Sequence, residues 1–120
     1  AGASVEANRG DVLEIARKFN KMKDRVIASV CTGSLILGRA GLLDNRPATT
    51  NQKFFDILSS MKAIATHARV VDDGNIITAG GITASLDLGL WLVQRYAGAE
   101  RALEVSKELE FEMRGPVCSR

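Results

Sequence analysis

A short apolar run near the start of the chain constrains the fold more than any other stretch. Residues 26–30 read VIASV, with no regular alternation between apolar and polar positions. Continuous runs of this kind are typical of strands in a parallel sheet that is covered on both faces. Cys31 follows at once, and from Gly33 onward the apolar spacing becomes helical. The sequence therefore predicts a buried strand that turns sharply into a helix at Cys31.

Helical periodicity predicts further helices on either side of this turn. Asp11, a residue type that caps helix N-termini, is expected to begin the first helix, which has apolar residues along one side. A short helix is expected at about 54–58, and a long one begins at the cap Thr83. The long helix is apolar nearly all round, which predicts deep packing. The last helix is expected at about 100–111.

The remaining strands are predicted at 48–50, 68–71 and 75–78, the last two joined by a turn at 72–74. Pro116 is expected to end regular structure. Strands that alternate with helices indicate an α/β domain with a doubly wound, mainly parallel sheet.

The 120 residues fit one domain that spans residues 1–120. Ten small and polar residues precede the first helix, whereas a doubly wound domain normally begins with a strand. We therefore expect the sheet to be partial and the domain to be incomplete at its N-terminal side.

Composition argues against several classes of function. The net charge of +2 does not require a nucleic-acid partner, and no helix-turn-helix is expected after Phe111. The basic residues at 17–25 are interpreted as the solvated end of a helix rather than a phosphate-binding patch. One His without paired cysteines predicts neither a metal site nor a cofactor.

Cysteine usage and hydropathy bear on the cellular compartment. Cys31 and Cys118 have no paired spacing, so a disulfide is not expected and a reducing cytoplasm is the default. The chain has no apolar stretch long enough to span a membrane, and it does not open with a signal peptide. These features predict a cytoplasmic protein without a membrane partner.

The turn at Cys31 is where the sequence points to chemistry. A residue between a strand and a helix is pushed out above the carboxyl edge of the sheet, and the small Gly33 lets the chain fold tightly there. The N–H groups that begin the helix favour negative charge, so they can stabilise a thiolate or an oxyanion. Thr32 and Ser34 place hydroxyls nearby. The alternative is a small, inert, buried cysteine.

Other residues allow both a functional and a structural interpretation. His67 is either a base for Cys31 or a surface-loop histidine, and the latter is preferred. Asp87 is either a buried catalytic acid or a local hydrogen-bonding residue near a helix start. Residues 79–83 resemble a phosphate cradle only loosely, and close packing of turn and helix explains them better. Trp91 is interpreted as a core or interface residue.

Two longer stretches carry a resemblance to a known family. Residues 30–50 (VCTGSLILGRAGLLDNRPATT) and 68–90 (ARVVDDGNIITAGGITASLDLGL) resemble the ThiJ/PfpI superfamily, whose fold is that of the class I glutamine amidotransferases. The Cys-Thr-Gly sequence is similar to the isonitrile hydratase branch. The amidase-like domains of AraC-type regulators share it. The resemblance covers nearly the whole chain and implies a flavodoxin-like sheet with a cysteine nucleophile elbow.

The resemblance also implies roles for individual residues. Cys31 matches the nucleophile, and Thr32 matches the neighbour that assists it. The oxyanion or substrate-binding positions are expected at Gly33, Ser34, Gly80, Gly81 and Thr83. Asn51 stands where the family usually has His, so a polar contact near the site is expected to be altered. The family's active-site carboxylate precedes the matched part, and no acid of this chain corresponds to it.

The function implied is cysteine-dependent hydration of a small molecule, an isonitrile, to an N-substituted formamide. Without the partner carboxylate, this activity is expected to be weak or absent. The alternatives are a non-catalytic regulatory module, related to the domain of AraC-type regulators, and a redox or carbonyl-stress protein in which Cys31 is oxidised. A homodimer or higher oligomer is expected to cover the open edge of the sheet.

Overall fold

A computed structural model describes residues 10–119, and its centre is a four-stranded sheet of order β1–β5–β4–β6. The strands are β1 (Ile27–Val30), β4 (Val70–Asp72), β5 (Ile76–Ala79) and β6 (Val117–Ser119). Strand β5 runs parallel to β1, and β6 runs parallel to β4, whereas the hairpin β4–β5 is antiparallel. The sheet is therefore mainly parallel, as predicted.

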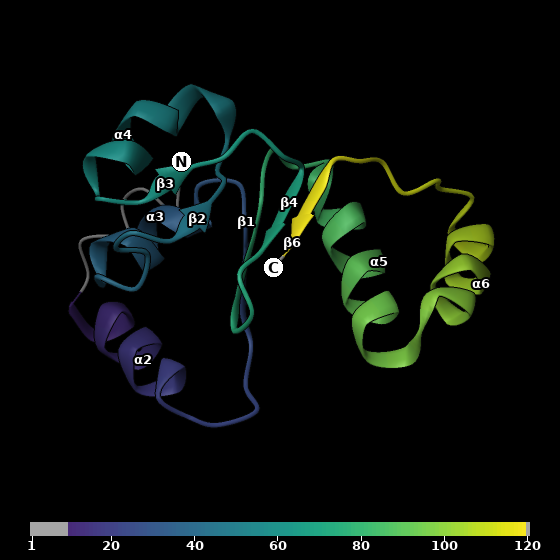
Figure 1. Ribbon diagram of the computed structural model, residues 1–120, viewed down its shortest axis with the longest axis horizontal. Helices are drawn as coiled ribbons and strands as arrows, with labels where there is room; N and C mark the ends of the chain where they lie inside the picture. Colours follow the sequence, from purple (N-terminus) through teal and green to yellow (C-terminus); the bar gives the residue numbers. More distant parts are fainter. Residues whose placement is uncertain (1–9, 120) are drawn as a thin grey trace.

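Helices cover both faces of this sheet (Figure 1). On one side lie α2 (Gly10–Asn20), α3 (Gly33–Arg39) and α4 (Phe55–Ser60), the last preceded by a 3₁₀ turn, Gln52–Phe54. A short parallel pair, β2 (Pro47–Ala48) with β3 (Ile64–Ala65), lies beside α3. On the other side, α5 (Ala84–Ala97) and α6 (Ala99–Leu109) form a helical hairpin in which α6 packs on α5.

Each face of the sheet contributes to a separate apolar core. Ile76 faces the core beneath α3 and α4, whereas its neighbour Ile77 faces the core beneath α5. The two isoleucines are 1% and 0% exposed. Burial on both faces explains why this strand consists of apolar residues and Thr78 without polar alternation.

The structure corrects three expectations about the elements. Helix α2 begins at Gly10, so Asp11 lies in its first turn and is not the cap. Helix α5 is buried along one side only, since Leu86 is 43% and Tyr96 65% exposed. Regular structure does not end at Pro116, because β6 follows it and pairs with β4.

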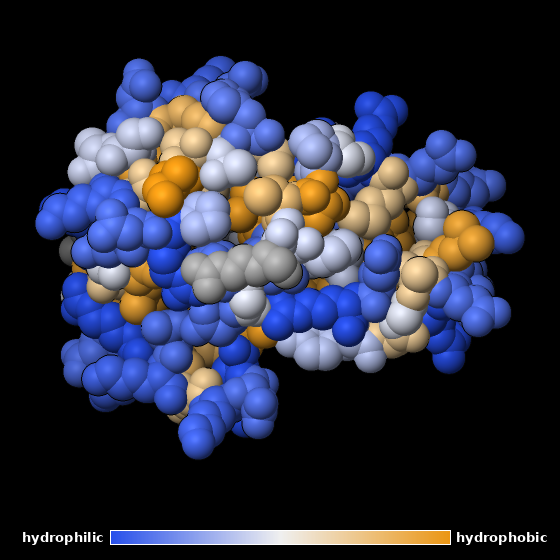
Figure 2. Space-filling model, viewed as in Figure 1, coloured by the Kyte–Doolittle hydropathy of each residue, from blue (hydrophilic) through white to orange (hydrophobic). Residues whose placement is uncertain are grey.

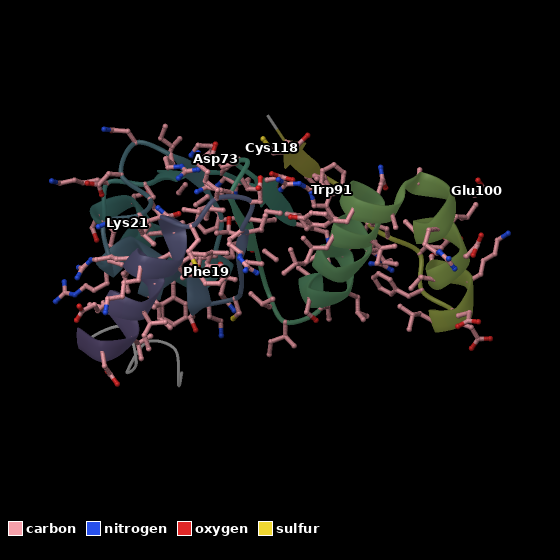
Figure 3. All side chains as sticks on the ribbon, turned by 90° about the horizontal axis from the view of Figure 1, so that it is seen from below. Phe19, Lys21, Asp73, Trp91, Glu100 and Cys118 are labelled. Atoms are coloured by element: carbon pink, nitrogen blue, oxygen red, sulfur yellow. The ribbon has the colours of Figure 1, made fainter. Side chains whose placement is uncertain are left out.

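The molecular surface is a mosaic of hydrophilic residues with apolar ones between them (Figure 2). Within residues 10–119, none of the helices combines the length and apolar character needed to cross a bilayer. Trp91 lies between α5 and the sheet (Figure 3), where its indole N–H donates to Asp72 Oδ2 at 2.7 Å. Trp91 is thus a partly buried packing residue, in line with the interpretation from sequence.

Candidate functional site at the strand–helix turn

Cys31 forms the turn that the sequence predicts between a buried strand and a helix. Its backbone φ is +58°, a left-handed conformation that few residues other than glycine adopt. The Cys31 N–H donates to the Ala79 carbonyl at 3.0 Å, which continues the β1–β5 ladder by one residue before the chain turns. A Cβ at Gly33 would lie 3.4 Å from Ser29 Cβ, so the turn is tight. The structure therefore shows the nucleophile-elbow geometry.

Polar side chains hold Cys31 from two segments. Thr50 Oγ1 donates to the Cys31 carbonyl at 2.9 Å, and Ser34 Oγ donates to the same carbonyl at 3.4 Å. Asn51 Nδ2 lies 3.4 Å from Cys31 Sγ and donates to it. Cys31 as a whole is half-buried, so protein groups surround the residue without enclosing it completely.

A cavity of about 260 Å³ lies beside these residues. Two wall residues connect the cavity to the elbow. Thr50 donates to the Cys31 carbonyl, and Gly80 directly follows Ala79, whose carbonyl accepts from the Cys31 N–H. The wall combines backbone, hydroxyl, aromatic and cationic groups, from Thr49, Thr50, Gln52, Phe55, His67, Ala68, Arg69, Gly80, Gly81, Ala84 and Pro116. This volume lies slightly below the roughly 300–1,000 Å³ that is usual for ligand pockets, so it favours a ligand of few atoms.

An aromatic pair forms one part of the cavity wall. The rings of Phe55 and His67 stack with their centroids 4.4 Å apart and an interplanar angle of 22°. His67 is exposed and lies in the segment before β4, as expected of a loop histidine. Its structural contact is thus with Phe55, and its place on the wall makes it a candidate substrate-contacting residue.

A buried ion pair orients the cationic group of the cavity. Asp87 is fully buried on α5, and its Oδ2 accepts from Arg69 Nε at 2.9 Å and from Nη2 at 2.8 Å. Its other oxygen accepts from the backbone N–H of Arg114. The interpretation of Asp87 as a locally bonded residue is therefore wrong, because its partners come from distant segments. Burial requires such partners for a carboxylate.

Comparison with known proteins identifies the family. The model of the DJ-1/PfpI family matches residues 2–95. The chain belongs to the DJ-1/PfpI family. Isonitrile hydratase of Pseudomonas putida is 47% identical over 95 residues, which make up 79% of this chain and 42% of that protein.

Two further relatives of this DJ-1/PfpI chain differ in kind. The HTH-type transcriptional regulator CdhR of Pseudomonas aeruginosa is 31% identical over 89% of this chain and 37% of its own length. The crystal structure of a ThiJ/PfpI family protein from Pseudomonas syringae superposes with a TM-score of 0.86 at 37% identity. The match covers 97% of this chain and 48% of that one. The chain thus spans less than half the length of these relatives.

The residues that the sequence nominated occupy four different environments in this DJ-1/PfpI domain. Cys31 and Gly33 form the elbow, whereas Thr32 (4% exposed) and Ser34 (0%) are buried beneath it. Gly80 and Gly81 line the cavity. Thr83 occupies the N-cap position of α5 without a side-chain capping bond, and its Oγ1 lies 3.3 Å from Arg69 Nη2.

Within residues 10–119, no group of three or more His, Cys, Asp or Glu side chains is arranged to bind a metal.

Proposed function

We propose that Cys31 is the nucleophile of a hydratase that converts isonitriles to N-substituted formamides. The observation that carries this proposal is the left-handed elbow at Cys31, with an amide donor on its sulfur. A small cavity is lined by Thr50, which bonds the Cys31 carbonyl, and by Gly80. The 47% identity to isonitrile hydratase and the Cys31-Thr32-Gly33 sequence support this substrate class.

The proposed reaction has two steps. The Cys31 thiolate adds to the terminal isonitrile carbon, a C–S bond forms, and the same carbon takes a proton, which gives a thioimidate. Water then adds to that carbon, the C=N π bond breaks, and the nitrogen takes a proton. The C–S bond then breaks with its electrons on sulfur, and the hydroxyl loses its proton to give the formamide. The sum is one isonitrile and one water converted to one formamide, so no oxidant or cofactor is consumed.

The other nominated residues receive supporting roles. The backbone amides of Thr32 and Gly33 lie at the start of α3 and would stabilise negative charge that develops on the substrate. Ser34 fixes the Cys31 carbonyl through its buried hydroxyl. Gly80 and Gly81 leave room for the substrate's N-substituent, and Thr83 supports Arg69 on the cavity wall.

Proton delivery sets the expected rate. The carboxylate that the family resemblance implies has no match in this sequence, so water must supply the proton when residues 1–120 are assayed alone. General acid catalysis typically contributes about 10²–10⁴-fold. We therefore expect slow turnover, below that of a protein that retains the acid.

The test is incubation of the purified chain with an aliphatic isonitrile, with formamide measured by NMR. Cys31→Ala is expected to lower the rate by about 10²-fold or more, because it removes the attacking atom. Cys118→Ala is the matched control, since Cys118 is exposed on β6 and should leave turnover unchanged. Equal formamide production by the Cys31→Ala and wild-type proteins would refute the proposal.

A second candidate is a binding module that does not turn over its ligand. It is favoured by the similarity to transcriptional regulators, with CdhR 31% identical and GlxA of Rhizobium meliloti 35% identical. Saturable binding of the same isonitrile in calorimetry, without formamide and unchanged by Cys31→Ala, would select this candidate over the hydratase.

A further inference from the structure

The side-chain amide of Asn51 has both of its ends fixed. Its Oδ1 accepts from the Lys53 backbone N–H at 3.0 Å, as the cap of the 3₁₀ turn that begins at Gln52. Its Nδ2 lies 3.4 Å from Cys31 Sγ. Exchanging the two amide ends would set two donors against each other at Lys53 and would leave the sulfur without its N–H. The donor end therefore faces the sulfur.

The segment that carries Asn51 is itself anchored to the sheet. Thr49 is 1% exposed, and its N–H donates to Thr78 Oγ1 on β5 at 2.9 Å. Thr50, 2% exposed, donates to the Cys31 carbonyl. Consecutive residues thus hold the backbone and the sulfur of Cys31, and the sheet fixes their position.

We propose that Asn51 is a positioning residue that activates Cys31 by donating a hydrogen bond to its sulfur. A donor is bound more strongly by a thiolate than by a thiol, so the contact favours the nucleophilic form. An amide N–H cannot accept the thiol proton, so Asn51 acts without being a base. This inference deepens the proposed function and rests on Cys31 being the nucleophile.

Alkylation by iodoacetamide tests the inference without any isonitrile. The thiolate displaces iodide, and mass spectrometry of peptides gives the rate at Cys31 and, in the same molecule, at the exposed Cys118. Asn51→Asp keeps the acceptor for Lys53 N–H but removes the donor. Asn51→Ala removes both. We expect both variants to slow alkylation of Cys31 by about tenfold or more, with Cys118 unchanged.

Each other result overturns the inference. If Asn51 acted only through the turn, Asn51→Asp would react like the wild type and Asn51→Ala would be slower. If only the added charge mattered, Asn51→Ala would react like the wild type. The ultraviolet absorbance of the thiolate at neutral pH, lower in both variants, gives a second readout that a change in accessibility alone would not produce.

The two proposals fail separately. Absence of formamide, with alkylation slowed in both Asn51 variants, would refute the hydratase and keep the role of Asn51. Normal formamide production, with alkylation of Cys31 unchanged in either variant, would refute the role of Asn51 and keep the hydratase.

Discussion

Cys31 holds a backbone conformation that a side chain makes costly. In the left-handed region the Cβ approaches the following carbonyl oxygen, which costs roughly 1–2 kcal/mol for residues other than glycine. The φ of +58° places Cys31 in this region, and the surrounding ladder and side-chain bonds keep it there. Strain of this kind persists where the rest of the structure over-determines it, often at functional sites.

A glycine substitution at Cys31 should therefore leave the protein more stable than an alanine substitution, the reverse of the usual order. We expect the free energy of unfolding of Cys31→Gly to exceed that of Cys31→Ala by about 1 kcal/mol, as measured by urea denaturation. Cys118 offers the control, because it lies in β6, where glycine has no conformational advantage and alanine should be the more stable substitution. An alanine variant at position 31 at least as stable as the glycine variant would contradict the strain.

The sequence predicts site residues to different extents. The strand–turn–helix pattern is local, so it was sufficient to place Cys31 at the turn, whereas Gly80 and Gly81 were nominated only through the family resemblance. The contact of Asn51 with the sulfur depends on two segments meeting at one edge of the sheet, and its sequence position indicated only an altered polar contact. The pairing of Asp87 with Arg69 could not be predicted, because no periodicity encodes which distant cation reaches a buried acid.

At the scale of elements, two helical glycines differ in what surrounds them. A Cβ at Gly38 of α3 would lie 2.7 Å from Met61 Sδ and 3.3 Å from Met61 Cβ. A Cβ at Gly89 of α5 would meet nothing within 4 Å. Gly38 thus allows α3 to approach the end of α4 closely, whereas Gly89 serves no such contact.

This difference predicts opposite effects of the same substitution. Gly38→Ala should lower the free energy of unfolding by roughly 1–3 kcal/mol, because Met61 must move in a packed region. Gly89→Ala should raise it by about 0.5–1 kcal/mol, because alanine favours a helix interior. Thermal or urea denaturation of the two variants provides the measurement. A stabilising Gly38→Ala would mean that the packing of α3 against Met61 is loose.

Most elements were predictable because their periodicity is clear, whereas the short strands β3 and β6 were missed. Strand β6 has three residues and follows Pro116, which usually marks the end of regular structure. Its formation depends on the free edge of β4, where Val70 pairs with Val117. Such short strands are determined by the sheet they join rather than by their own residues.

At the scale of the whole molecule, β1 is an edge strand in the sheet of residues 10–119. Ile27 and Cys31 donate their N–H groups toward β5, so the amides of Ala28 and Val30 point to the open edge. Ile15 on α2 and Met22 just after it are 66% and 52% exposed. Uncovered strand edges and apolar side chains favour association.

We therefore predict that the chain forms a dimer or larger oligomer through this edge. Light scattering should give at least twice the chain mass of 12.9 kDa. Ala28→Pro, which removes an outward amide, should shift the protein toward monomer, whereas Ala28→Thr keeps the amide and should not. A folded wild-type monomer at working concentrations would contradict the prediction.

The place of Pro116 in the cavity wall has a consequence for biosynthesis. Pro116 lies beyond every other wall residue in the sequence, from Thr49 to Ala84. As the chain leaves the ribosome, the strands and helix that form the elbow are complete well before Pro116 and β6 can dock against β4. During synthesis, the elbow at Cys31 can therefore form before the cavity wall is complete. Pro116 can join that wall only after α5 and α6 have been translated.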